Sequence, residues 1–247
     1  MKKIFEDIKS GKISVEEAEK LLKLDYLEKI GNSVKYDSSR MMRRNVPEIV
    51  YGKGKSLEEL IEIGNRIGKT DCVIITKLDS DTIKNLEKKL SNISKINERA
   101  GVVIIGKELQ GNGKVGIISA GTSDIPIAEE AAMVAEAIGC KVFREYDVGI
   151  SGLHRIIDAA KKMKEEEIKV VIVVAGMEGA LPSITASLMD VPVIGVPTST
   201  GYGYGKNGEA ALMGMLNSCT LGLAVMNIDN GVGAAVFASL ILKEKSY

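Results

Sequence analysis

The sequence has little of what several classes of protein require. It has three cysteines among 247 residues, an odd number, and no two are spaced like a zinc knuckle. The 33 basic residues balance 33 acidic ones, so net charge attracts neither nucleic acid nor an anionic membrane. No apolar run is long enough for a bilayer span, and the opening MKKIFEDIKSGKIS lacks a signal peptide's apolar core. We therefore expect a soluble cytoplasmic protein with reduced thiols, no nucleic-acid partner and no membrane contact.

Changes in composition and periodicity divide the chain into four parts. Residues 2–24 indicate two short helices, and Ser14 with Glu17 gives a capping-box signal before the second. A polar stretch without strong periodicity follows. After it, short apolar tracts alternate with helical patterns, the first of them with Ser56 as the expected N-cap. The parts are a helical appendage, a connector, a small α/β segment and a larger domain, at residues 1–30, 31–47, 48–110 and 111–247.

The larger domain has the most regular pattern. Strands and helices alternate with one βα unit in about 25–30 residues, which predicts right-handed crossovers and a parallel sheet. The strands are apolar on both faces, as expected when helices cover both sides of a sheet. The predicted strands are 114–120, 140–147, 169–176, 191–197 and 221–227, and the predicted helices are 126–138, 153–165, 180–189, 208–217 and 231–243.

Polar and glycine-rich loops follow all five of these strands. In chain order they contain AGTSDIP, VGISGLHR, GMEGALPS, TSTGYGYGKNG and IDNGVG. Ligands of open parallel sheets bind outside the carboxyl ends of the strands. A scaffold without a site needs a turn at each place, but not this chemistry at all five. The convergence therefore predicts a binding or active site at that edge.

The loop AGTSDIP has two interpretations. Gly121 permits a tight turn, and a proline suits the first turn of the helix that follows. Free N–H groups at such a helix start favour a phosphate. An ordinary capped βα turn explains the same residues, and the loop by itself favours that interpretation. Three residues can act as the cap: Thr122, Ser123 and Asp124.

The next loops add ionisable and aromatic candidates. His154 is the only histidine and adjoins Arg155, which can bind a phosphate or carboxylate through two N–H groups. A lone histidine is usually structural or solvated, so proton transfer by His154 is the weaker interpretation. Glu178 lies at the mouth of the sheet beside Gly179, where small residues indicate close approach by a ligand or backbone. Tyr202 in GYGYG has a ring that can stack on a base.

The three cysteines differ in their surroundings. Cys72 and Cys140 lie in or beside predicted strands and are expected to be buried small apolar residues. Cys219 follows a predicted helix and precedes a strand, where a polar setting would lower its pKa and favour the thiolate. Its position leaves open whether it packs or reacts.

The loop sequences resemble those of a known family. SAGTSDIPIAEEAA, YDVGISGLHR, VVIVVAGMEGALPS, PVIGVPTSTGYGYG and MLNSCTLGLAVMNIDNGVGAA are similar to the signature blocks of the LarB family of pyridinium-3,5-biscarboxylic acid mononucleotide synthases. DSSRMMRRNVPEIVYGKGKS resembles the N-terminal block of that family, and the similarity covers about residues 37–243. The GTSD, LHR and LPS…PVIGVP elements also resemble the aminoimidazole ribonucleotide carboxylases, or PurE family. The resemblance implies a flavodoxin-like, three-layer parallel sheet and a homo-octamer.

The LarB resemblance implies an activity. The substrate would be nicotinic acid adenine dinucleotide, carboxylated on its pyridinium ring with CO2 or bicarbonate and then hydrolysed to release AMP. The product would be the precursor of the nickel-pincer nucleotide cofactor of lactate racemase. A divalent metal such as Mg2+ on the substrate phosphates would assist the hydrolysis. No resident metal ligands are identified.

The same resemblance assigns roles to residues. Cys219 would be the covalent nucleophile, since thiolate addition removes the ring's positive charge. Glu178 would be the first candidate for the base and His154 the second. The expected phosphate and ribose contacts are Thr122, Ser123, Asp124 and Arg155, with Asp229 and Asn230 completing the pocket.

Two other functions remain open at this point. One is an aminoimidazole ribonucleotide carboxylase or mutase, which needs no thiol nucleophile. The other is a non-catalytic nucleotide-binding module, which would bind the dinucleotide without turnover.

Overall fold

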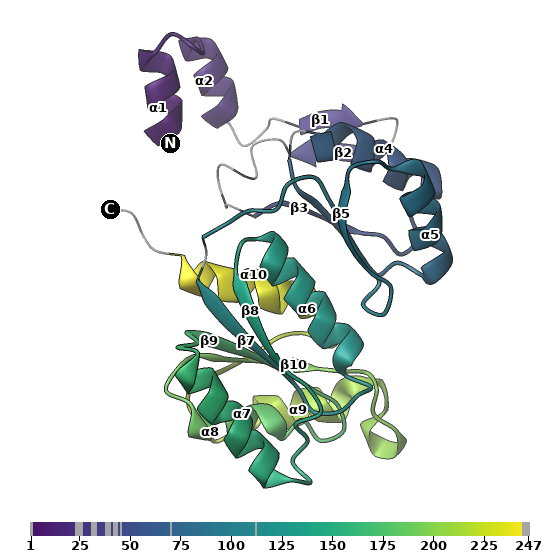
Figure 1. The fold of residues 1–247 in the computed structure, drawn as a ribbon, viewed down its shortest axis with the longest axis vertical. Coiled ribbons are helices and arrows are strands. Elements are labelled where there is room, and N and C mark those ends of the chain that lie inside the picture. Colours follow the sequence, from purple (N-terminus) through teal and green to yellow (C-terminus); the bar gives the residue numbers. More distant parts are fainter. Residues whose placement is uncertain are drawn as a thin grey trace.

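A computed structural model describes residues 2–22, 27–30, 34–37, 41, 44, 46–69, 71–111 and 113–243. The chain begins with helices α1 (Lys2–Lys9) and α2 (Val15–Leu22), which lie apart from the rest in Figure 1. The predicted capping box is confirmed. The Glu17 N–H donates to Ser14 Oγ at 3.1 Å, and the Ser14 N–H donates to Glu17 Oε2 at 2.8 Å.

Strands β1 (Leu27–Ile30) and β2 (Val34–Asp37) form an antiparallel pair that the sequence did not predict. They occupy the end of the stretch assigned to the helical appendage and the start of the connector. Each strand has only four residues, too few for alternation to show. The first and second arginines of the DSSRMMRR block, Arg40 and Arg43, lie outside the described residues.

The small α/β segment is a mixed four-stranded sheet with the order β3-β4-β6-β5. Strand β3 is parallel to β4, and the other two pairings are antiparallel. Ser56 caps its first helix through the predicted capping box with Glu59. The edge strand β5 was not predicted. The elements are β3 (Glu48–Tyr51), α4 (Leu57–Arg66), η1 (Ile67–Lys69), β4 (Val73–Thr76), α5 (Ser80–Lys89), β5 (Ile93–Asn97) and β6 (Val102–Ile105).

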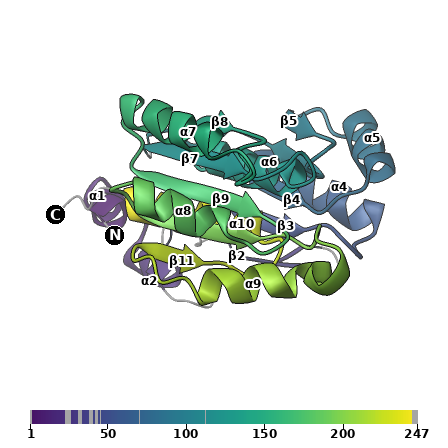
Figure 2. The same cartoon turned by 90° about the horizontal axis from the view of Figure 1, so that it is seen from below.

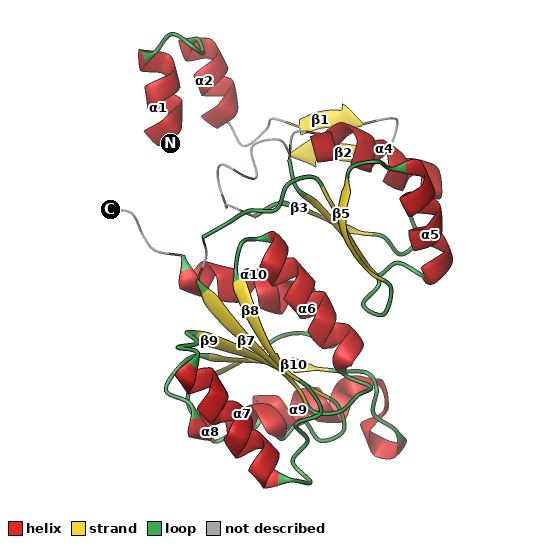
Figure 3. Cartoon of the chain, in the orientation of Figure 1, coloured by secondary structure: helices red, strands yellow, loops and turns green. Residues whose placement is uncertain are grey.

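The larger domain is the predicted parallel sheet, with the order β11-β10-β9-β7-β8. This is the flavodoxin-like strand order, and its switch point lies between β7 and β9. Helices lie on both faces (Figure 3), so the three-layer α/β prediction is confirmed. The elements are β7 (Lys114–Ser119), α6 (Ile125–Ala137), β8 (Lys141–Glu145), α7 (Leu153–Glu165), β9 (Val170–Ala175), α8 (Leu181–Leu188), β10 (Val193–Pro197), η2 (Gly203–Gly208), α9 (Glu209–Leu216), β11 (Leu223–Val225) and α10 (Gly231–Leu242).

The two sheets share the helices between them. Helices α6 and α10 contribute to one buried cluster that also takes alternate residues of both sheets, such as Ile74 from β4 and Ile172 from β9. Helices α4 and α5 cover the outer face of the small sheet, and α7, α8 and α9 cover the other face of the large sheet (Figure 2). Sheet residues therefore divide between cores with period two, as strand geometry requires. Within the described residues, no helix is long and apolar enough to cross a membrane.

Candidate active site

A pocket of about 360 Å3 lies at the carboxyl edge of the large sheet, beside the switch point. Loops after β7, β8, β9 and β10 converge there, so the predicted location at this edge agrees with the structure. Five residues proposed from the sequence line it: Gly121, Ser123, Asp124, Glu178 and Tyr202. Ser151, Met177 and Thr200 also line it and were not singled out. They stand in the loops whose composition indicated a site.

Asp124 is the buried polar centre of this pocket, with a 4% exposed side chain. Its Oδ2 accepts the Gly121 N–H at 2.9 Å. Its Oδ1 accepts the Thr198 hydroxyl at 2.6 Å and the Thr200 hydroxyl at 2.9 Å. The carboxylate is thus occupied in joining the loops after β7 and β10. It gives the α6 N-terminus no capping hydrogen bond. That helix start therefore presents amide N–H groups that suit a phosphate.

Glu178 and its neighbours form a strained loop after β9. Met177 has a φ of 52°, and a Cβ on Gly179 would lie 2.5 Å from the Ala211 carbonyl oxygen. The loop therefore lies directly against α9, and only glycine fits this close approach. The Glu178 carboxylate is exposed and has no hydrogen-bond partner among the described residues. Tyr202 is 76% exposed at the same mouth. Both side chains are free to contact a ligand.

His154 and Arg155 begin α7 and do not line this pocket. His154 is exposed. Arg155 donates to the Asp147 carbonyl oxygen at 2.7 Å and to Ser151 Oγ at 3.3 Å. Arg155 therefore positions the loop that carries Ser151 to the pocket. Thr122 is exposed beside the pocket, and its carbonyl oxygen accepts from Arg99 Nη2 at 2.6 Å.

Cys219 lies between α9 and β11, at the amino edge of the sheet. Since β11 and β10 are parallel, this is the edge opposite the one that carries Glu178. The thiol is exposed, and Leu216 and Leu221 beside it are 64% and 91% exposed. Within one chain, the structure does not bring Cys219 into the pocket. Cys72 and Cys140 are buried, and burial raises the pKa of their thiols to about 12 and about 11, which agrees with the packing role predicted for them.

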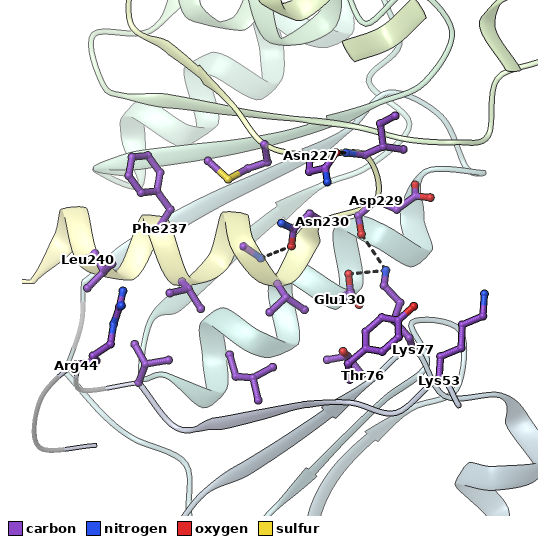
Figure 4. Close-up of a pocket in the computed structure, with 18 residues that line it drawn as sticks. Arg44, Lys53, Thr76, Lys77, Glu130, Asn227, Asp229, Asn230, Phe237 and Leu240 are labelled. Atoms are coloured by element: carbon purple, nitrogen blue, oxygen red, sulfur yellow. Dashed lines mark hydrogen bonds and ion pairs between the residues drawn. The ribbon is translucent and has the colours of Figure 1, made fainter. Parts of the chain in front are cut away.

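Asp229 and Asn230 line a second pocket, of about 1000 Å3, between the small sheet and α10 (Figure 4). Asp229 has a φ of 55° and accepts the Ser199 N–H on Oδ1 at 2.9 Å, which ties it to the loop after β10. Asn230 caps α10 through the Gly233 N–H at 2.7 Å. The sequence did not predict this interdomain pocket. Its signal was that α10 has apolar or small residues around its whole circumference, which is typical of a helix that packs on more than one side.

One buried ion pair joins the two domains in this pocket. Lys77 follows β4, and its Nζ contacts Glu130 Oε2 on α6 at 2.9 Å. The same Nζ donates to the Asp229 carbonyl oxygen at 2.9 Å. Burial raises the pKa of Glu130, and Lys77 partly opposes that rise.

Among the described residues, no cluster of three or more acidic, histidine or cysteine side chains is placed to hold a metal ion. These residues do not fit a resident metal centre, and we derive no step through one.

The Asp124 cluster predicts a measurable difference between two buried threonines. Thr198 donates to a carboxylate, whereas Thr185 donates to the Leu181 carbonyl within α8, and both are 0% exposed. Thr198→Val is expected to lower the free energy of unfolding by about 1.5–3 kcal/mol, and Thr185→Val by about 0.5–1.5 kcal/mol. Urea denaturation of both variants checks this. Equal losses would show that the Asp124 carboxylate adds nothing to the strength of its bond.

Comparison with known protein families finds a match for each of the two domains. Residues 114–246 match the AIR carboxylase family, and residues 27–107 match the LarB/PurE-like N-terminal domain. An uncharacterized protein of Methanocaldococcus jannaschii is 49% identical over 244 residues, which cover 95% of this chain and 94% of that protein.

A group of mutases matches a smaller part of this chain. N5-carboxyaminoimidazole ribonucleotide mutases of Pyrococcus horikoshii and Thermotoga maritima are 36% and 33% identical to it. They cover 52% of this chain, and 71% and 74% of their own lengths. The chain therefore belongs to the AIR carboxylase, or PurE-like, family and has the two-domain organisation of a LarB-type member.

Proposed function

We propose that this PurE-related protein carboxylates the pyridinium ring of nicotinic acid adenine dinucleotide and hydrolyses its phosphoanhydride. The products are pyridinium-3,5-biscarboxylic acid mononucleotide, for the nickel-pincer cofactor, and AMP. The observation that carries the proposal is the thiol of Cys219, which is exposed while Cys72 and Cys140 are buried. A thiolate is the nucleophile that an electron-poor ring accepts and later releases.

The carboxylation is balanced without an oxidant or a reductant. The Cys219 thiolate adds to a ring carbon, and the positive charge on the ring nitrogen is lost. The resulting enamine carbon attacks CO2 and forms the new carbon–carbon bond. Glu178 removes the proton from that carbon, the carbon–sulfur bond breaks, and the aromatic pyridinium is restored. The exposed carboxylate of Glu178 in the pocket supports its role as the base, with His154 as the second candidate.

The hydrolysis uses the phosphate-binding side of the same pocket. The uncapped start of α6 and the Ser123 side chain suit the phosphate attached to the pyridine ribose. Water attacks the phosphoanhydride, and AMP leaves. In this proposal Mg2+ belongs to the substrate as the counter-ion of its phosphates.

If Cys219 and Glu178 act on the same substrate, their placement at opposite edges means that they come from two copies of the chain. We include in the proposal a homo-oligomer, with an octamer expected, in which Cys219 of one subunit enters the pocket of another. The exposed Met213, Leu216 and Leu221 around Cys219 support this arrangement, because large apolar side chains grouped on a surface mark contact sites.

Product analysis tests the proposed function. We would incubate the wild-type protein with nicotinic acid adenine dinucleotide, bicarbonate and Mg2+, and separately with aminoimidazole ribonucleotide. Mass spectrometry is expected to find AMP and the dicarboxylated pyridinium mononucleotide in the first reaction only. Carboxylated aminoimidazole ribonucleotide in the second would establish the purine-pathway alternative, which the likeness to the mutases favours. Binding without any product would indicate a non-catalytic module.

A further inference from the structure

The interdomain pocket has an apolar interior shaped by two elements from different domains. Strand β3 contributes Ile49, and α10 contributes Val232, Val236 and Phe237. Figure 4 shows Phe237 on α10. Its volume of about 1000 Å3 is that of a small-molecule site. Apolar walls on two sides suit a flat aromatic ring.

The rim of this pocket is cationic and continues toward the active-site pocket. Lys53 and Lys77 line the interdomain pocket and also an adjoining pocket of about 460 Å3, which contains Arg99. The carboxylates of Asp79 and Glu98 line the adjoining pocket as well. That of Asp79 accepts a hydrogen bond from the Thr82 N–H. Arg99 donates to the Thr122 carbonyl oxygen, one residue before Ser123 of the active-site pocket. Basic side chains thus line both the interdomain and the adjoining pocket, and Arg99 contacts the loop that carries Ser123.

A second link joins the same two pockets. Asp229 lines the interdomain pocket, and its carboxylate accepts the N–H of Ser199. Thr200, the next residue, lines the active-site pocket. The two pockets are therefore neighbours by two independent routes.

The interdomain pocket also contains a buried acceptor without a donor. Glu130 lines it and is 0% exposed, and among the described residues its Oε1 has no hydrogen-bond partner. An unpartnered buried carboxylate oxygen is costly. A ligand hydroxyl or amino group in the pocket would supply the missing donor.

From these contacts we infer that the interdomain pocket binds the adenylate half of the dinucleotide. The adenine ring lies between β3 and α10, a ribose hydroxyl or the adenine amino group donates to Glu130, and the phosphates follow Lys53, Lys77 and Arg99 toward the start of α6. This inference rests on the proposed function. The N-terminal domain thus helps to bind the adenylate, the second nucleotide of the substrate. The N5-carboxyaminoimidazole ribonucleotide mutases, by contrast, match only 52% of the chain.

Direct binding of AMP, with matched controls, tests this inference. Val236→Trp fills the pocket, while Ile241→Trp places the same side chain on α10 outside the pocket lining. Lys53→Glu reverses a rim charge, while Lys55→Glu reverses an exposed charge on the same loop outside both pockets. Equilibrium dialysis with labelled AMP is expected to show at least about tenfold weaker binding for Val236→Trp and Lys53→Glu, with both controls like wild type. Binding of nicotinic acid mononucleotide is expected to stay unchanged in all four.

The outcomes separate this inference from the proposed function. AMP affinity that is equal in wild type, Val236→Trp and Lys53→Glu overturns the inference, as does a wild type that does not bind AMP at millimolar concentration. A wild type that makes the dicarboxylated product while Val236→Trp keeps the same KM for the dinucleotide overturns the inference and leaves the function standing. A wild type with no product whose AMP binding is lost in Val236→Trp supports the adenylate pocket and rejects the carboxylation.

Discussion

Cys219→Ser is expected to lower kcat for carboxylation of nicotinic acid adenine dinucleotide by on the order of 10^3-fold or more, the scale on which loss of a covalent nucleophile acts. The serine hydroxyl is a much weaker nucleophile than a thiolate at neutral pH. Mass spectrometry of the products measures the rate, and the intact-protein mass is expected to show a substrate adduct on wild type only. Ser218→Ala is the matched control, because it alters the same loop without removing the thiol.

Mixing two inactive variants tests where Cys219 acts. If the thiol enters the pocket of another subunit, co-expression of Cys219→Ser with Glu178→Gln restores part of the activity, because some pockets then receive both wild-type groups. If Cys219 and Glu178 acted within one chain, no mixed assembly would contain a complete pocket. Continued inactivity in confirmed mixed oligomers would therefore reject the shared site.

Lys77→Met is expected to lower the free energy of unfolding at neutral pH by up to about 3–5 kcal/mol, because it leaves the buried Glu130 without its cation. The loss should depend on pH. Burial already raises the pKa of Glu130, and removing Lys77 raises it further. A carboxyl whose pKa is higher in the folded state holds its proton more tightly there, so stability falls as pH rises from the unfolded pKa, about 4.3, through the folded one. Denaturation at about pH 5 and pH 8 is expected to show the larger loss at pH 8.

The double variant Lys77→Met with Glu130→Gln is the control for this prediction. It removes the buried charge together with its partner, so most of the stability at pH 8 should return. A single variant that is no less stable than the double variant at pH 8 would show that the loss does not come from the unpaired charge of Glu130. The measurement is made without ligand, since both residues also line the interdomain pocket.

The sequence predicted the larger domain almost element for element because strands such as β7, β9 and β10 are apolar runs, each followed by a helical pattern. It missed β5, in which Lys95 interrupts a short exposed edge strand, as is common where a sheet must not pair further. It also missed β1 and β2, whose four-residue lengths leave no period to detect. Short strands depend on partners distant in the sequence, which local patterns do not report.

One topological rule predicted part of the candidate site. Because carboxyl ends of parallel strands meet, the rule grouped Gly121, Ser123, Asp124 and Glu178 correctly. It did not indicate that Asp124 would bond Thr198 rather than cap α6, since that choice depends on how two loops pack. The interdomain pocket could not be predicted, because it forms where the small sheet packs near α10, and no local sequence pattern indicates that packing.

The helices that lie between the two sheets also determine how the chain unfolds. Helix α6 contacts strands β4 and β6 of the small sheet and β7 and β9 of the large one, and its buried residues belong to one cluster with Ile74, Ile104, Ile117 and Ile172. If either sheet melted, that helix would expose an apolar face to water while the other sheet was still folded. Local opening of one domain is therefore nearly as costly as losing both. The two domains are expected to unfold cooperatively, in one transition, although the described strands form separate sheets with no pairing between the two domains.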